Sequence, residues 1–236
     1  MGTLRRRAAW VTSYHAFQRS KSTGNYLGML TGQFTRCEAD DGSPGACGQH
    51  VDSIYAQLAR SGRSWNEFDE AADVPCDTSD HGPYVAHHVP AAYLAGMCAG
   101  GDLPMGPGAY DTSALDARLA QGDVGTLTVL VPNNCENGHD VCGVNPVHAF
   151  DRFLAREVPK IERSPAFGSN GTLIVTWDEG DFNDHVLLLA TGGLVRPGTY
   201  HGARYTHYSL LGTLETGFRA PLLRGARGAR TLPIWR

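Results

Sequence analysis

The 236-residue chain lacks any long hydrophobic run, and no stretch approaches the roughly 20 apolar residues that a membrane-spanning helix needs. It also lacks an excess of positive charge, because lysine and arginine number 20 against 24 acidic residues, a net charge of −4. A nucleic-acid-binding protein is expected to be strongly basic. No repeat, low-complexity tract or shift in composition divides the chain. We therefore predict one domain over residues 1–236, with no membrane span and no nucleic-acid partner.

Two further absences concern export and zinc. The basic start, Met1 to Arg7, has no long apolar segment behind it, so no signal peptide is predicted within this sequence. No Cys-x-x-Cys spacing occurs, which argues against a structural zinc site. The six cysteines fall in sequence as Cys37 and Cys47, Cys76 and Cys98, and Cys135 and Cys142. Their even number and close spacing favour local disulfides in a secreted or cell-surface protein over reduced thiols in a cytosolic one, and leave the pairing open.

The apolar pattern predicts an α/β fold. Strands are expected at 126–131, 172–177 and 186–190, and helices at 51–58, 147–161 and 209–218. Because strands and helices alternate, the sheet should be mostly parallel and central, with helices on both faces.

The run from Gly171 to Gly180 is the most informative segment. Apolar and β-branched residues end abruptly in two adjacent carboxylates, Asp178 and Glu179. The carboxyl end of a buried strand is where α/β proteins usually place their chemistry. Carboxylates at such a position serve as oxygen ligands for a metal ion or as a general acid/base pair.

A second polar loop follows the strand predicted at 126–131 and contains His139 and Asp140. In a parallel sheet, loops after neighbouring strands open on the same edge, so these residues are expected to face Asp178 and Glu179. Histidine with carboxylates is a normal ligand set for zinc, manganese or iron. The alternative is that His139 and Asp140 cap the next helix and remain solvated.

Hydroxyls and histidines form weaker signals elsewhere. Ser22 precedes a short predicted helix, Tyr26 to Leu30. A hydroxyl there lies beside backbone N–H groups that favour a phosphate, although a plain N-cap is the commoner role. His207 stands just before a predicted helix, and a lone histidine at that position is more often structural than catalytic.

Six motifs in order resemble those of a known family. It is the phosphoesterase family of bacterial and fungal acid phosphatases and phosphocholine-preferring phospholipases C, in the alkaline-phosphatase-like superfamily. The resemblance extends from about Tyr14 to the region of Leu223. The motifs are Ser22-Thr-Gly-Asn-Tyr-Leu, Ser64-Trp65, His88-Val-Pro, Pro132-Asn-Asn with Asn137-Gly-His-Asp140, Thr176-Trp-Asp-Glu-Gly180, and Tyr205-Thr-His-Tyr-Ser-Leu-Leu.

This resemblance implies an alkaline-phosphatase-like fold and a metal-assisted hydrolysis of phosphate esters. Ser22 matches the family's nucleophile, which also contacts the metal. Asp178 matches the first of the paired metal-binding acids, and Glu179 occupies the second position. The ion would be divalent, with its identity left open.

The resemblance also implies roles for several other residues. His88 and His139 match histidines that contact phosphoryl oxygens or protonate the leaving group. Asn25, Asp140 and His207 are possible additional site residues. The substrate would be a small phosphate ester or a phospholipid head group, and the oligomeric state is left open.

One departure from the family concerns its Glu-Asn pair, which ends the first strand and helps to bind the metal. No Glu-Asn pair precedes Ser22 here. We therefore expect a chain truncated at its N-terminus relative to the family, without that strand and its two ligands. The function expected is acid-phosphatase-like phosphomonoester hydrolysis. The alternatives are a phospholipase C-type phosphodiesterase and, in another class, an inactive fragment or secreted binding module.

Overall fold

The computed structural model describes residues 2–17, 20–34, 37, 40–180 and 183–235. The chain forms two compact units, and each is assembled from separate stretches of sequence. Unit 1 comprises Ser43–Gly48 and Ser61–Gly168. Unit 2 comprises Gly2–Gly42, Gln49–Arg60 and Ser169–Arg236. A single domain over 1–236 stays a prediction.

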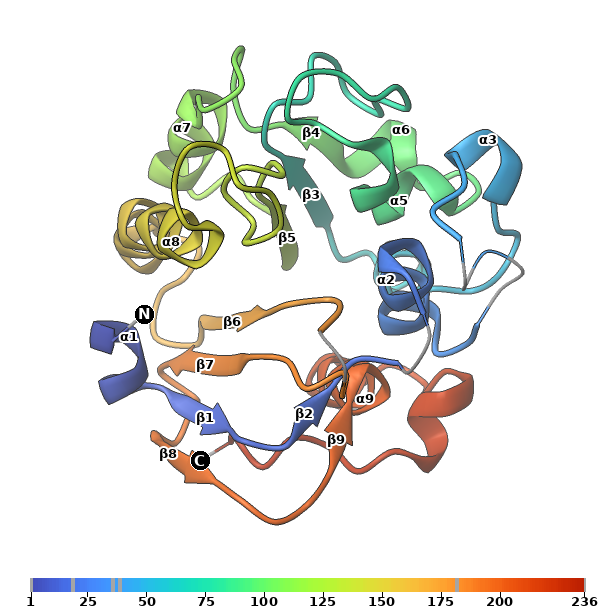
Figure 1. Cartoon of the computed structure of the whole chain (residues 1–236). Helices are drawn as coiled ribbons and strands as arrows, with labels where there is room; N and C mark the ends of the chain where they lie inside the picture. Colours follow the sequence, from blue (N-terminus) through green and yellow to red (C-terminus); the bar gives the residue numbers. More distant parts are fainter. Residues whose placement is uncertain (1, 18–19, 35–36, 38–39, 181–182, 236) are drawn as a thin grey trace. The chain divides into compact units, whose positions relative to one another are not determined.

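Unit 1 is built on a three-stranded parallel sheet with the order β4-β3-β5. Its strands are β3 (Trp65–Asp69), β4 (Asp102–Pro104) and β5 (Leu127–Val131). Its helices are α3 (Pro44–Cys47), η1 (Ala86–His88), α5 (Pro90–Tyr93), α6 (Cys98–Gly101), α7 (Ser113–Gln121) and α8 (Pro146–Arg163). Figure 1 shows α5 and α6 to one side of the three strands and α7 and α8 to the other.

The longest helix, α8, forms where the apolar spacing predicts one. Asn145 precedes it, and the side chain of this residue accepts a hydrogen bond from the backbone N–H of His148 at 3.3 Å. This satisfies one of the free N–H groups of the first turn, next to a proline at the first helical position. Phe150, Phe153 and Val158 are among the residues that it buries.

Unit 2 contains a four-stranded sheet with the order β6-β7-β1-β8 and a separate parallel pair, β2-β9. The β6–β7 and β7–β1 pairs are antiparallel, and the β1–β8 pair is parallel. The strands are β1 (Ala9–Val11), β2 (Tyr14–His15), β6 (Thr172–Thr176), β7 (Leu188–Gly192), β8 (Gly198–Tyr200) and β9 (Tyr205–Thr206). The helices are α1 (Gly2–Arg7), α2 (Ser22–Thr31), α4 (Ile54–Arg60), α9 (His207–Phe218) and η2 (Arg224–Gly228). The core includes Val11, Tyr14, Leu188, Leu210 and Ile234.

The predicted α/β class is confirmed, with parallel strands flanked by helices in unit 1, whereas the four-stranded sheet of unit 2 is mixed. Several boundaries differ from those predicted. The strand expected at 186–190 is β7, Leu188–Gly192, and the helix expected at 51–58 is α4, Ile54–Arg60. Hydrophobic periodicity locates a buried segment, but its ends depend on where hydrogen-bond partners stop, and the sequence pattern does not contain them.

The predicted meeting of the two polar loops at one sheet edge stays a prediction, because the strands before them belong to different units. Strand β5, before His139 and Asp140, pairs with β3 in unit 1. Strand β6, before Asp178 and Glu179, pairs with β7 in the four-stranded sheet of unit 2. Both strands have the apolar run of a buried strand, and that run does not encode which strand lies beside it.

The prediction of local disulfides is confirmed. Cys76 is bonded to Cys98 and Cys135 to Cys142, with Cα–Cα distances of 5.3 and 5.4 Å. Cys37 and Cys47 are also disulfide-bonded. Within the described part of the chain, no helix has both the length and the apolar character needed to cross a membrane.

Candidate active site

Ser22 is the first residue of α2, and only 2% of it is exposed. The helix therefore begins earlier than the predicted Tyr26. Lys21 precedes Ser22 in extended conformation and makes no side-chain cap. The Ser22 side chain instead hydrogen-bonds to the carboxylate of Asp178. Two residues that the sequence singled out separately are thus in contact.

Asp178 lies two residues after Thr176, the last residue of β6. Its carboxylate accepts the Ser22 hydrogen bond together with backbone N–H groups of Asp178 and Glu179. The second oxygen, Oδ2, is buried and has no hydrogen-bond partner among the described residues. Burial raises the pKa of Asp178 and these hydrogen bonds partly offset the effect. A buried carboxylate oxygen without a donor suits contact with a cation. The half-buried Glu179 lies next to it.

Asp41 is a residue of this region that the sequence interpretation missed. Its Oδ1 accepts a hydrogen bond from the backbone N–H of Thr23 at 3.1 Å, within the first turn of α2. Its charge contributes to the raised pKa of Asp178, so two carboxylates are close enough to repel each other near Ser22. The only signal in the sequence is the Asp40-Asp41-Gly42 turn, and adjacent acids in such turns are usually solvated.

Asn25 is fully buried and braces the loop that leads into α2. Its Oδ1 accepts a hydrogen bond from the backbone N–H of Phe17 at 2.9 Å. Its Nδ2 donates to the backbone carbonyls of Lys21 at 3.2 Å and Ser20 at 3.5 Å. These contacts fix the position of Ser22 and occupy the Asn25 side chain.

His207 is fully buried as the first residue of α9. Its Nδ1 lies 2.8 Å from the Tyr14 hydroxyl, and its Nε2 lies 2.6 Å from the backbone carbonyl oxygen of Asp178. Because a carbonyl only accepts, Nε2 carries the proton and Nδ1 accepts from Tyr14. Burial lowers the pKa of His207 to about 4. The neutral ring therefore positions Asp178, and both of its nitrogens are engaged.

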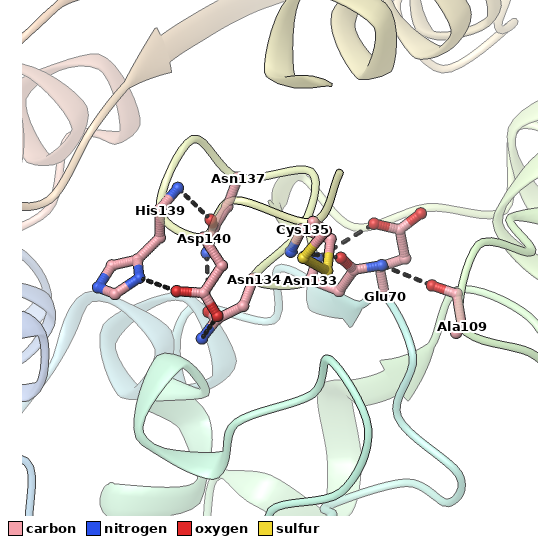
Figure 2. The surroundings of a disulfide bond; sticks show 9 residues. Glu70, Ala109, Asn133, Asn134, Cys135, Asn137, His139 and Asp140 are labelled. Atoms are coloured by element: carbon pink, nitrogen blue, oxygen red, sulfur yellow. Dashed lines mark hydrogen bonds and ion pairs between the residues drawn. A yellow bond between two sulfur atoms is a disulfide. The ribbon is translucent and has the colours of Figure 1, made fainter. Parts of the chain in front are cut away.

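The loop after β5 in unit 1 holds His139 and Asp140 and is closed by the Cys135–Cys142 disulfide (Figure 2). His139 Nδ1 lies 2.7 Å from Asp140 Oδ1. The backbone N–H of His139 donates to Asn137 Oδ1 at 2.8 Å. Both side chains of this pair are about half exposed, at 53% and 49%. The alternative that they cap the next helix is wrong, because Asn145 caps α8.

His88, in η1 of unit 1, is buried, and its ring centroid lies 6.1 Å from that of His139. Its Nδ1 lies 3.4 Å from Asn137 Nδ2, which makes Nδ1 the acceptor and leaves the proton on Nε2. Burial lowers the pKa of His88 to about 3, helped by His87 and His139. His88 is therefore a neutral hydrogen-bond donor at neutral pH.

Glu70 is a second residue that the sequence interpretation missed. It lines a small pocket of unit 1 together with Asp69, His88 and Asn133. Its Oε2 accepts from the backbone N–H of Asn133 at 3.1 Å (Figure 2). Burial raises the pKa of Glu70 to about 8. The sequence did contain a feature that could have identified Glu70, because this residue ends the acid-rich stretch that follows Ser64-Trp65.

The expected metal ligands are only partly assembled. Three compact groups of cysteine, histidine or acidic side chains of the kind that can hold a metal ion occur among the described residues, and none contains Asp178 or Glu179. These groups are Cys76–Cys98–Asp102, Asp73–Asp77–His81 and Glu67–Asp69–Asp102. Around Ser22, the free and buried Oδ2 of Asp178 is the feature that fits a cation.

The α/β fold, a serine hydroxyl at a helix start held by a carboxylate, and a histidine–aspartate pair are typical of a hydrolytic enzyme directed at phosphate. The chain belongs to the Phosphoesterase family, whose model matches residues 3–221. It is similar to the phosphatidylinositol-3-phosphatase of Mycobacterium tuberculosis, with 25% identity over 225 residues. That alignment covers 91% of this chain and 68% of the other protein. The protein is a phosphoric ester hydrolase.

Proposed function

We propose that the protein hydrolyses phosphate monoesters with Ser22 as the nucleophile, assisted by a divalent metal ion. The observation that carries this proposal is the hydrogen bond between Ser22 and the buried carboxylate of Asp178 at the start of α2. A serine hydroxyl is a weak nucleophile at neutral pH and needs a neighbouring group that activates it. The N-terminus of a helix also favours the negative charge of a phosphoryl group.

Ser22, Asp178 and Glu179 would hold the metal, with Asp41 as a further carboxylate nearby. The oxygen-only donor set suits a hard divalent cation, and the unpartnered Oδ2 of Asp178 offers it a ligand atom. When bound, such an ion would stabilise the ionised serine hydroxyl and offset the charge of the phosphoryl oxygens.

The reaction would proceed in two displacements. The Oγ of Ser22 attacks phosphorus, the bond from phosphorus to the ester oxygen breaks, and the leaving oxygen takes a proton. Water then attacks the phosphoserine, which releases inorganic phosphate and restores the serine hydroxyl.

The two histidines of unit 1 would have different roles. His139 would be the proton donor, as the family resemblance implies; Asp140 orients it through Nδ1 and its ring is half exposed to solvent. His88 is neutral with its proton on Nε2, and the family resemblance implies that this N–H would donate to a phosphoryl oxygen. Glu70 shares the His88 pocket and would influence the charge there.

The relative is named a phosphatidylinositol-3-phosphatase. That name favours a monoesterase here and makes a phosphorylated phospholipid head group a candidate substrate. A phospholipase C-type diesterase is the second candidate, since it would use the same residues. The disulfides are compatible with a secreted or cell-surface protein.

Hydrolysis of a chromogenic phosphomonoester, with and without added divalent cations, tests the nucleophile. We expect Ser22→Ala to lower turnover on the order of 10³-fold or more while the protein remains folded. Ser20→Ala, two residues earlier and outside the helix, is the matched control and should keep its activity. Full activity in Ser22→Ala would contradict the proposal.

A second assay separates the substrate classes. Phosphatidylinositol 3-phosphate and phosphatidylcholine are incubated with the metal-loaded protein, and the released products are identified. Inorganic phosphate from the first lipid supports the monoesterase, whereas phosphocholine from the second supports the diesterase. A folded protein that turns over neither lipid and no chromogenic ester with any metal would favour the inactive fragment or binding module.

A further inference from the structure

Three carboxylates are buried together on the sheet of unit 1. Glu67 and Asp69 lie two residues apart on β3 and so point to the same face, and Asp102 is the direct neighbour of Glu67 on β4. The residues are 0%, 1% and 3% exposed, respectively. One ligand atom from each lies within 4.8 Å of those of the other two.

Asp69 is the least satisfied member of this group, which we call the β3–β4 acid cluster. Both of its carboxylate oxygens are buried and accept no hydrogen bond from an N–H or hydroxyl group of the described residues, and the carboxyl group of Asp102 is the polar group that contacts them. Asp102 is partly satisfied by the backbone N–H of Cys76, and Glu67 accepts from the backbone N–H of Ala91 at 3.1 Å. Asp69 and Asp102 form no ion pair with any lysine, arginine or histidine in the described part of the chain.

Burial of several carboxylates without a positive partner is costly. The pKa values of two of these carboxyl groups are accordingly raised. Burial and the neighbouring acids raise the pKa of Asp69, and burial raises that of Asp102. A proton shared by these two residues could remove one charge at most. A divalent cation would offset two charges and give the oxygens of Asp69 a positively charged partner.

We propose that the β3–β4 acid cluster, Glu67, Asp69 and Asp102, binds one Ca²⁺ ion. The three residues supply only oxygen atoms, which hard cations prefer, and Ca²⁺ takes such ligands at roughly 2.3–2.6 Å. Mg²⁺ fits less well because it gives up its water shell reluctantly, and the cluster is buried. The nearby Cys76 and Cys98 are joined in a disulfide, so they offer no thiolate for zinc.

The ion would tie β3 to β4 beside the Cys76–Cys98 disulfide. Asp69 also lines the pocket that contains Glu70 and His88, so the same ion would hold one wall of that pocket in place. This role is structural and belongs to unit 1, whereas the metal proposed for catalysis belongs to Ser22 and Asp178 in unit 2.

Calorimetric titration of the chelator-treated, full-length chain with CaCl₂ alone tests the proposal. We expect Asp69→Asn to lose one equivalent of bound Ca²⁺ relative to the wild type. The wild-type Tm should rise by roughly 5–10 °C at a hundredfold excess over Kd, and Asp69→Asn should not show this rise. Asp123→Asn, a change to an exposed acid of unit 1 outside the three groups of metal-ligating side chains, should bind as the wild type does.

An Asp178→Asn background separates this ion from the catalytic one. In that background the Asp69-dependent equivalent should persist even if phosphatase activity is lost, so failure of either proposal can be recognised independently. Wild-type protein that binds no Ca²⁺ in an Asp69-dependent way would overturn the inference. Stability that depends on pH but not on Ca²⁺ would also overturn it, in favour of a shared proton.

A spectroscopic readout covers the case in which the variant fails to fold. The Trp65 ring packs against Gly101, which precedes Asp102, so Trp65 can transfer excitation energy to Tb³⁺ bound in the cluster. Tb³⁺ luminescence that Ca²⁺ displaces in the folded Asp178→Asn protein, and that Asp102→Asn weakens at least tenfold in affinity, supports the site. Absence of that luminescence contradicts it.

Discussion

His207 holds the end of β6 in place through both of its ring nitrogens. Tyr14 donates to one nitrogen, and the other donates to the backbone carbonyl of Asp178. A general acid must exchange a proton with substrate, and this buried ring has none to spare. The residue therefore belongs to the site as a positioning residue that sets the orientation of Asp178.

The low pKa of His207 predicts an acid-sensitive fold. Its folded-state pKa of about 4 lies below the ordinary 6.5, so its contribution is complete above pH 6.5 and is lost as the pH falls towards 4. We expect His207→Gln to lower the free energy of unfolding at pH 7 by about 1–3 kcal/mol and to flatten its fall between pH 6.5 and 4. Urea unfolding at several pH values measures both, with the exposed His50→Gln as control. An unchanged acid slope in His207→Gln would refute this role.

The pKa of Glu70 is shifted upwards, so its effect on stability changes with pH in the opposite direction to that of His207. Its folded-state pKa of about 8 lies above the ordinary 4.5, because burial favours the neutral acid. Its stabilising contribution is therefore complete below pH 4.5 and disappears as the pH rises through 8. We expect Glu70→Gln to gain on the order of 1–3 kcal/mol of stability relative to the wild type between pH 5 and 8. Glu162→Gln, on α8 of the same unit, is the control, and parallel stability curves for Glu70→Gln and wild type would disprove the assignment.

At the scale of elements, the start of α2 depends on the loop before it. Asn25 makes three side-chain hydrogen bonds to that loop and is fully buried. A helix start that lacks a side-chain cap at Lys21 gains its fixed geometry from these bonds and from Asp41 at the Thr23 N–H. The hydrogen bonds of Asn25 and of Asp41 together fix the position of Ser22.

Removal of the Asn25 amide should therefore affect catalysis as well as stability. We expect Asn25→Ala to lower the free energy of unfolding by about 1–3 kcal/mol because backbone groups of the loop lose their partners. It should lower kcat more than it raises KM, since Ser22 would be misplaced by a fraction of an ångström. Steady-state kinetics and urea unfolding give the two quantities, and the exposed Asn170→Ala is the control. A loss of stability with unchanged kcat would remove the positioning role.

Strand β3 shows why an element can escape prediction. Its sequence, Trp-Asn-Glu-Phe-Asp, has acids at positions that a buried strand normally fills with apolar residues, so the alternation typical of a strand is hidden. Helix α8 and strands β5 and β6, whose apolar spacing is regular, were predicted to within a few residues.

At the scale of the whole molecule, disulfides contribute part of the free energy of unfolding. The Cys76–Cys98 bridge spans 22 residues, and cross-linking a loop of that length stabilises by roughly 3 kcal/mol in the chain-entropy treatment. The loop that it closes contains His88. The bridge therefore limits the conformations open to part of the candidate site.

Replacing Cys76 and Cys98 together by serine should lower the free energy of unfolding by roughly 3 kcal/mol. Urea unfolding without reductant measures the change, and adding a reductant to the wild type should produce a loss at least as large. The double variant should respond less to reductant than the wild type does. Equal responses would show that this bridge contributes nothing to stability.

The candidate site was predictable where one short segment carries the chemistry. Ser22 and Asp178 were each identified from local motifs, and the structure brings them into contact. Asp41 and Glu70 were missed because an acid in a polar stretch resembles any solvated acid until its burial and partners are known. The edge that the loops after β5 and β6 were expected to share stays a prediction, because the pairing of strands from different units is not encoded in their apolar runs.

The sequence by itself determined the features that neighbouring residues encode: the amphipathic helix α8, the apolar strand β6 that leads to Asp178, the local character of the disulfides and the ordered family motifs. Only the tertiary structure decided which strands pair and which polar groups lose their solvent. Tyr14 and His207 are hydrogen-bonded across 193 residues, and Glu67 meets Asp102 across two strands. Such contacts arise from packing between distant segments, and burial then sets the charge and pKa of each group, so no local pattern could contain them.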